Sequence, residues 1–272
     1  MMWCQGPGYE PDRTKGQRVE AEGIPASIAT AWGVRDQPRK GPKPALTLQR
    51  IIDAAVRVAD AEGLGAVSMG RVAAEAGTAP MSLYRHVANK EELIDHMLDA
   101  AWYSAAEYSP TDEAAPDLSG GDWRAGLSHW AWQMRAAARQ HPWAIRIPIK
   151  TLPIMPNEVA WFENALACMA GTGLSESQKA SVIMLLSGYV RNLAATEADI
   201  WAAMQASGLA PDQWMSSYAQ MLRKLTNPRD YPALAVFLES DVFDKMDHPD
   251  DEFIFGLDRI LDGIAALIDA GR

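Results

Sequence analysis

Apolar residues recur every three or four positions through most of this chain, and no segment shows the alternation of period two that a half-buried strand needs. The first run, 48–59, has its apolar side chains at helical spacing, with Thr47 placed to cap its start and Gly63 placed to end it. Two longer runs, 182–200 and 253–267, carry wide apolar faces. The pattern predicts an all-α fold.

Residues 68–90 predict two short helices joined by a glycine turn, followed by the start of a third helix. Ser68 is placed to cap the first helix, and Gly77 follows its last apolar position. Thr78 is placed to cap the second helix, and Asn89, with a glutamate three residues later, to cap the third. A bracing helix followed by a reading helix is the layout of a helix-turn-helix, whose second helix enters the major groove of DNA.

The helix-turn-helix interpretation leaves a set of side chains at the front of these helices. The predicted DNA contacts are Arg50, Ser68, Arg71, Thr78, Ala79, Pro80, Met81, Ser82, Tyr84, Arg85, His86 and Lys90. Arg85 is predicted to contact a base or phosphate, and Lys90 to bind a phosphate together with helix N–H groups. The alternative is an ordinary helical hairpin in which Tyr84 and His86 only pack.

Three motifs between residues 46 and 105 follow one another at fixed spacing: VAAEAG at 72–77, LYRHV at 83–87 and NKEEL at 89–93. Through them the chain resembles the DNA-binding domain of the tetracycline-repressor (TetR) family of regulators. Residues 121–270 resemble the C-terminal domain of that family less strongly, chiefly through FIFGLD at 253–258. The resemblance implies a helical C-terminal domain that binds a small ligand and forms a homodimer through a four-helix bundle. Most relatives are repressors that the ligand releases from DNA.

Charge is distributed unevenly along the 272 residues, whose net charge is −10. Residues 1–90 carry 12 Lys and Arg against 9 Asp and Glu, and the remainder carries 13 against 26. Because exposed charges are screened beyond about 8–10 Å, an acidic body does not prevent the basic N-terminal part from binding DNA. No apolar run is long enough for a membrane span and no leader is evident, so we expect a cytoplasmic protein without membrane contact. Cys4 and Cys168 suggest neither a disulfide framework nor a metal site.

We expect three parts: a flexible basic arm at 1–45, the helix-turn-helix domain at 46–105, and a ligand-binding and dimerisation domain at 106–272. In the arm, Arg39, Lys40 and Lys43 would follow the DNA backbone or enter the minor groove, or the segment is only a solubilising linker. The remaining predicted helices are 24–34, 123–140, 157–170, 213–225, 231–239 and 252–270, together with one that Ser175 or Ser177 caps and that runs to about 207. Loops are expected at 109–121 and 244–251.

Tryptophan is concentrated in the second half of the chain, with eight of the ten between residues 102 and 214. Such side chains line pockets for small apolar or aromatic ligands, although each one also suits an ordinary core. The predicted ligand-binding residues are Trp102, Trp130, Met134, Trp143, Ile147, Trp161, Phe162, Tyr189 and Asn192.

The tetracycline binders of the resembled family chelate a magnesium–drug complex through a histidine in the segment after the body's first helix. Residues 143–156 contain no histidine, and Glu197, near where such a site has an acidic partner, is one carboxylate and not a hard-cation site. We therefore expect a metal-independent ligand and no cofactor.

A palindromic operator presents half-sites about 34–36 Å apart, so specific binding requires two heads. The expected function is that of a homodimeric repressor released from double-stranded operator DNA by a hydrophobic or aromatic molecule. The alternative is a ligand-independent dimeric DNA-binding protein whose body serves only dimerisation or protein contacts. An enzyme is not expected, because no nucleophile elbow, phosphate loop or paired-cysteine metal site occurs.

Overall fold

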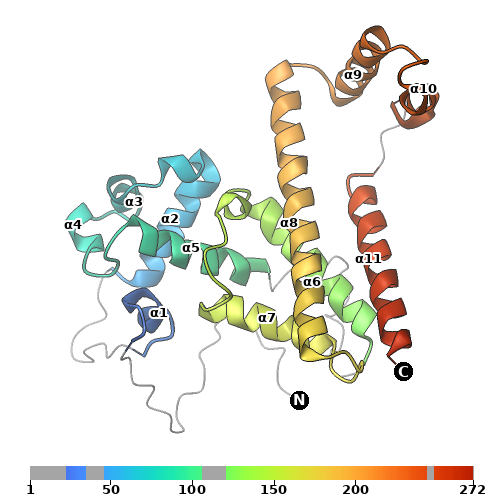
Figure 1. Ribbon diagram of the computed structural model, residues 1–272. Coiled ribbons are helices and arrows are strands. Elements are labelled where there is room, and N and C mark those ends of the chain that lie inside the picture. The colour runs from blue at the N-terminus through green and yellow to red at the C-terminus, as the bar shows by residue number, and fades with distance from the viewer. Residues whose placement is uncertain (1–22, 35–45, 106–120, 244–247, 272) are drawn as a thin grey trace.

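The computed structural model describes residues 23–34, 46–105, 121–243 and 248–271, and every regular element within these ranges is helical, as predicted. The longer helices are α2 (Leu48–Glu62), α5 (Lys90–Ala105), α6 (Trp123–Gln140), α7 (Pro156–Cys168), α8 (Glu176–Ser207), α9 (Pro211–Leu225) and α11 (Asp251–Ala270). The shorter ones are α1 (Ala26–Ala31), η1 (Leu64–Ala66), α3 (Met69–Glu75), α4 (Pro80–Leu83), η3 (Ala144–Arg146), α10 (Pro232–Glu239) and η4 (Asp241–Phe243). Figure 1 shows a small head at one side, a larger body beside it and a helical hairpin that projects from the body.

The head consists of α2, α3, α4 and the first turns of α5. Its core is formed by apolar side chains from each of these helices, among them Ile51, Val72, Leu83 and Leu93, which are fully buried. The spacing of these residues in the sequence therefore selects one inward face per helix. The two short helices, α3 and α4, and the two longer ones, α2 and α5, bury these faces against one another, which makes the head a compact unit.

Predicted capping residues fix the start of three helices. Thr47 Oγ1 accepts a hydrogen bond from Arg50 N at 3.2 Å, and Ser68 Oγ accepts one from Arg71 N at 3.2 Å. Asn89 Oδ1 accepts from Glu92 N at 2.8 Å. Each bond satisfies a backbone donor that the first turn of a helix leaves without an intrahelical partner.

The prediction that Thr78 caps the second helix of the motif is wrong. Ala79 occupies the N-cap position of α4 and its side chain makes no capping bond. Pro80 occupies the first turn, where its fixed φ suits a helix and its missing N–H costs nothing. The turn before it is as expected, because Gly77 has a φ of +69°, in the left-handed region that favours glycine.

The body packs α6, α7, α8 and α11 around a second core that includes Leu127, Leu186 and Phe253. The predicted ranges of these helices are close to those observed: α6 matches at both ends, α7 stops two residues earlier, and α11 starts one residue earlier. Ser175 caps α8, since its Oγ accepts from Gln178 N at 3.3 Å. Within the described ranges, no helix combines the length and the apolar character needed to cross a bilayer.

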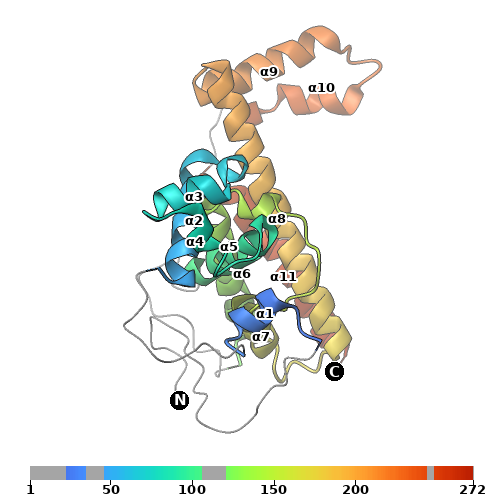
Figure 2. The same cartoon turned by 90° about the vertical axis from the view of Figure 1, so that its left-hand side faces the viewer.

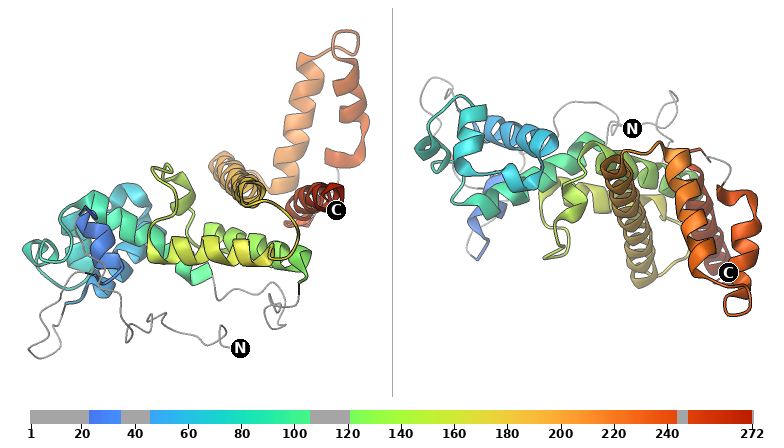
Figure 3. Two further views of the ribbon diagram at one scale, coloured as in Figure 1. Left: turned by 60° about the horizontal axis from the view of Figure 1, so that its bottom comes forward. Right: turned by 90° about the horizontal axis from the view of Figure 1, so that it is seen from above.

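Helices α9 and α10 form a hairpin beyond the end of α8. Figures 2 and 3 show that it extends away from both the head and the rest of the body. Its own small core contains Ala219, Leu238 and Phe243, while Leu225 and Val236 are largely exposed. Both helices begin with a proline: Pro211 lies two residues before the predicted start at 213, whereas Pro232 falls inside the predicted range 231–239.

Several segments of the sequence-based prediction lie outside the described residues. This holds for Arg39, Lys40 and Lys43, for most of the expected loop at 109–121 and for residues 244–247 of the acidic loop. The short helix predicted at 24–34 is present as α1, over Ala26–Ala31 only.

Candidate nucleic-acid interface and interior aromatic cluster

The turn before α4, α4 itself and the start of α5 form one exposed edge of the head. Met81 and Tyr84 are 74% and 48% exposed, and Ala79, Pro80 and Arg85 are exposed beside them. Thr78, Ser82 and His86 are half-buried on the same short segment, because Leu83 and Val87 anchor it to the head core. The structure thus brings together the predicted contacts from 78 to 86.

Two cations at this edge are available to an anion. Arg85 and Lys90 are exposed, and within the described part of the chain neither has an ion-pair partner. Lys90 opens the first turn of α5, whose N-terminal amide groups favour a nearby anion. Arg50 is exposed in the first turn of α2.

Arg71, by contrast, is held by two carboxylates. Its guanidinium donates to Glu62 Oε1 at 2.7 Å and to Glu75 Oε2 at 3.1 Å, and Arg57 also donates to Glu75 at 3.2 Å. Hydrogen bonds from Arg57 and then Arg71 hold the pKa of the Glu75 carboxyl below its usual range. A DNA contact by Arg71 therefore competes with bonds inside the head, and the hydroxyl of Ser68 is already used as a cap.

Three tryptophans from different helices meet inside the body. The Trp161 ring of α7 lies 5.5 Å from Trp130 of α6 and 6.4 Å from Trp102 of α5, measured between centroids. Trp130 Nε1 donates to the carbonyl of Trp161 at 3.1 Å. Trp161 Nε1 is itself buried, and no described residue accepts a hydrogen bond from it. Because buried donors are nearly always paired, this unpaired N–H is unusual among the buried polar groups of the body.

The predicted ligand residues do not all join this aromatic cluster. Trp102, Trp130, Met134, Trp161 and Phe162 belong to the body core or pack on it. Asn192 is exposed on α8, so it does not face that core.

Trp143 and Ile147 were assigned to the same pocket as the other tryptophans, but they pack in the head core. Trp143 Nε1 donates to Asp60 Oδ1 on α2 at 2.6 Å, and His141 Nδ1 lies 2.8 Å from the same oxygen. The same segment also contacts the body, because Arg191 of α8 donates to the carbonyls of Ile145 and Ile147 at 3.2 and 3.1 Å. The segment after α6 therefore connects head and body.

A buried arginine of α6, which was not among the predicted site residues, contacts the start of α11. Arg135 of α6 is 1% exposed, and its guanidinium lies 2.8 Å from both Glu197 of α8 and Asp250. It also stacks over the Phe253 ring, 4.5 Å from the centroid. Glu197 is therefore one member of an ion-pair cluster that ties α6, α8 and α11 together. Among the described residues, no three His, Cys, Asp or Glu side chains are arranged to hold a metal ion.

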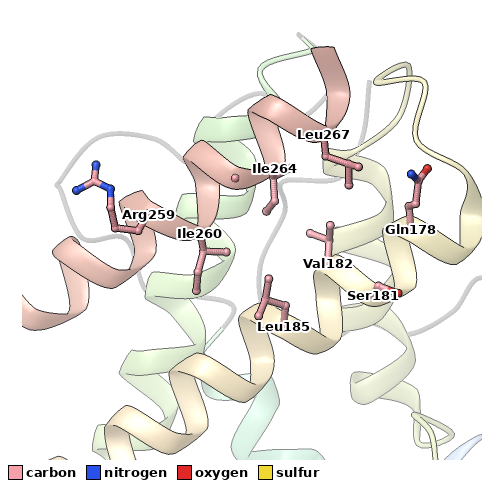
Figure 4. A pocket seen from close by; sticks show the side chains of 9 residues that line it. Gln178, Ser181, Val182, Leu185, Arg259, Ile260, Ile264 and Leu267 are labelled. Atoms are coloured by element: carbon pink, nitrogen blue, oxygen red, sulfur yellow. The ribbon is translucent and has the colours of Figure 1, made fainter. Parts of the chain in front are cut away.

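A groove of about 470 Å³ runs between α8 and α11 on the outer side of the body. Figure 4 shows Val182, Leu185, Ile260 and Ile264 directed into it from the two helices. Each helix buries one part of its apolar face inside the chain and leaves another part exposed; Met184 is 72% and Phe255 is 64% exposed. The two helices therefore present an apolar surface that the described residues leave exposed.

Comparison with known proteins gives two family matches. Residues 51–97 match the family described as "Bacterial regulatory proteins, tetR family", and residues 115–268 match "Tetracyclin repressor-like, C-terminal domain". The HTH-type transcriptional repressor DrrR1 of Streptomyces coeruleorubidus is 37% identical over 90% of this chain and 87% of its own length. ActR of Streptomyces coelicolor without ligand superposes with a TM-score of 0.66 at 26% identity, covering 85% of this chain and 100% of ActR. ActR in complex with actinorhodin gives 0.66 at 28%, over 83% and 97%.

Proposed function

The chain belongs to the TetR family of ligand-responsive, DNA-binding transcription regulators, and we propose that it is a homodimeric repressor that a small aromatic molecule releases from a palindromic operator. The observation that carries the ligand part of the proposal is the Trp102–Trp130–Trp161 cluster with its unpaired Trp161 N–H. Aromatic walls with few polar groups are typical of sites for planar ligands. ActR, a relative in fold and sequence, has been solved with actinorhodin bound.

Arg85 and Lys90 support the operator part. Both cations are exposed at one edge of the head and are not neutralised by a described neighbour. The head docks with the short helix α4 toward the major groove, so that Arg85 reaches a base or phosphate and Lys90 a phosphate. Thr78, Ala79, Ser82 and Tyr84 line the same approach.

The apolar surface of α8 and α11 supports the dimer part. Large exposed apolar side chains in contact with a groove are typical of a surface that another protein covers. In the proposed dimer, α8 and α11 of each subunit form a four-helix bundle that holds two heads at operator spacing.

In the proposed mechanism, ligand binding at the aromatic cluster moves α5, because Trp102 of that cluster lies on α5. The movement reaches the head, because the first turns of α5 form part of the head core. The distance between the two heads then changes. The ligand can shift operator affinity only by its differential affinity for the two states, typically about 1–3 kcal/mol.

The test measures operator binding with and without actinorhodin as the probe. DNA fragments are selected from genomic DNA by the purified protein, and binding is followed by fluorescence anisotropy at fixed salt, because phosphate contacts depend on ionic strength. We expect actinorhodin to weaken operator binding by roughly 5–150-fold. Trp161→Phe removes the unpaired N–H and should reduce this response while leaving binding without ligand intact. Trp214→Phe, on α9, is the matched control and should respond like wild type.

Two results would contradict the proposal in different ways. If neither actinorhodin nor a panel of planar aromatic compounds changes operator affinity or thermal stability, the ligand-independent alternative holds, in which the body serves dimerisation or protein contacts. If the response disappears in EDTA and returns with Mg²⁺, the proposed ligand is not metal-independent.

A further inference from the structure

Helix α5 takes part in both cores. Leu93, Met97 and Ala101 pack in the core of the head, while Trp102 packs against the core of the body. Asp99 lies between Met97 and Ala101 on this helix, three residues before Trp102, and is 7% exposed. A carboxyl group is thus buried where the helix passes from head to body, which is costly unless its oxygens are well bonded.

The Asp99 carboxyl group receives its bonds from the start of α7. Oδ1 accepts from the backbone N of Asn157 at 2.9 Å and of Glu158 at 3.1 Å, and Oδ2 accepts from Asn157 Nδ2 at 3.0 Å. The same Nδ2 lies 3.2 Å from the Asp99 carbonyl oxygen. The N-cap residue of α7, Met155, has no side chain that can cap it, so the free N–H groups of this helix are satisfied from another helix.

Burial dominates the electrostatics of this group. It raises the pKa of Asp99 to about 7, although the bonds from Asn157 and Glu158 act in the opposite direction. A buried polar joint of this kind contributes little net stability compared with apolar packing, but its directional bonds fix one geometry.

An aromatic contact joins the same two helices one turn further along each. Trp102, three residues after Asp99, contacts Trp161, four residues after Asn157. Aromatic surfaces can slide over one another, whereas three hydrogen bonds to one carboxyl group resist sliding. The polar joint therefore forces α5 and α7 to move together.

We propose that Asp99 is the positioning residue that couples the two halves of this protein: it fixes the start of α7 to α5, so that displacement of α7 at the aromatic cluster is passed along α5 to the DNA-reading head. This inference rests on the proposed ligand-responsive function, which gives the coupling its purpose.

The test is hydrogen–deuterium exchange of the full-length protein without ligand and without DNA. Asp99→Ala removes all the side-chain bonds. Asp99→Asn keeps the volume and resembles the neutral acid, so it covers the case in which the alanine variant does not fold. The matched control is Asp95→Asn, one turn earlier on α5, where the carboxyl group is 43% exposed and lies 4.0 Å from Lys150.

We expect the Asp99 variants to exchange several-fold faster at the first turn of α7 and, in addition, at the amides of residues 81–92 in the head. Exchange in the middle of α8 should stay at the wild-type rate, which separates coupling from a general loss of stability. The Asp95 variant should match wild type throughout. Faster exchange confined to α7 would show that Asp99 only caps that helix. Unchanged exchange both in α7 and in the head would show that the bonds of Asp99 stabilise neither region. Either result overturns the proposal. The measurement uses neither operator nor ligand. The exchange result can therefore be interpreted even if the proposed ligand-responsive function is wrong.

Discussion

Tyr189 and Gly256 meet where α8 packs on α11. The Tyr189 ring stacks on Phe253, with 6.0 Å between centroids and 18° between planes. Its hydroxyl donates to the carbonyl of Glu252 or Phe253, which lie 2.8 and 3.0 Å away. A Cβ at position 256 would overlap the phenol. Tyr189, expected in the sequence analysis to line a ligand pocket, therefore fixes the position of α11.

This contact makes Gly256→Ala a sensitive substitution. We expect it to lower the free energy of unfolding by about 1–2 kcal/mol, because overpacking against a bonded tyrosine outweighs the gain in helix propensity of alanine. Urea unfolding measures the change. Gly70→Ala, at an open position of α3, is the control and should raise stability slightly. Equal stabilisation of both variants would mean that Tyr189 moves aside without cost.

At the scale of elements, the reading edge of the head depends on which charges are already occupied. Arg71 and Arg57 are held by Glu62 and Glu75 and brace α2 against α3. Arg57 of α2 and Arg71 of α3 are thus paired within the head, and the segment from 78 to 90 presents Arg85 and Lys90 outward. Exposed ion pairs of this kind contribute little stability, so their effect is mainly on where positive charge remains available.

Arg85→Ala is therefore expected to weaken operator binding about tenfold or more, since one lost base or phosphate contact costs about 1–3 kcal/mol. Anisotropy titrations at two salt concentrations measure both the affinity and its salt slope. Circular dichroism and size-exclusion chromatography should be unchanged. The control, Arg229→Ala, removes an exposed arginine between α9 and α10. An Arg85 variant with wild-type affinity would show that another segment reads the operator.

At the scale of the whole molecule, the acidic body and the basic N-terminal part have separate roles. The body has a surplus of carboxylates and so disfavours unspecific contact with DNA, while the apolar surface of α8 and α11 offers a large area for association. In the proposed dimer, two such small heads bind one operator together.

Leu185→Asp should separate the proposed dimer. Leu185 is 54% exposed at the edge of the groove, so a charge there leaves the isolated subunit folded but is costly when buried between subunits. Light scattering after size-exclusion chromatography should show a monomer, with operator affinity strongly reduced. Leu152→Asp is the control, because Leu152 is 85% exposed in the loop before α7. A Leu185 variant that remains dimeric would place the interface elsewhere.

Signals between near neighbours in the sequence were sufficient for the secondary structure. Thr47, Ser68 and Asn89 cap helices as predicted, because a cap acts on an N–H group two or three residues away, and of the two candidates for α8 it is Ser175 that caps. The motifs at 72–93 were likewise sufficient to place the chain in its family. Thr78 was the exception, since a proline two positions later starts α4 without a side-chain cap.

Only the tertiary structure decided which distant groups meet. Trp143 and Trp161 are both large aromatic residues, the first in the turn before η3 and the second on α7, yet one packs in the head beside Asp60 and the other in the body beside Trp130. The bonds of Asp99 to the start of α7 and of Arg135 to Glu197 span 58 and 62 residues. Helical periodicity specifies which side of a helix is apolar, but the partner of that side depends on how whole helices pack. The sequence by itself therefore determined the helices and the DNA-reading motif, and packing determined the joints between head and body.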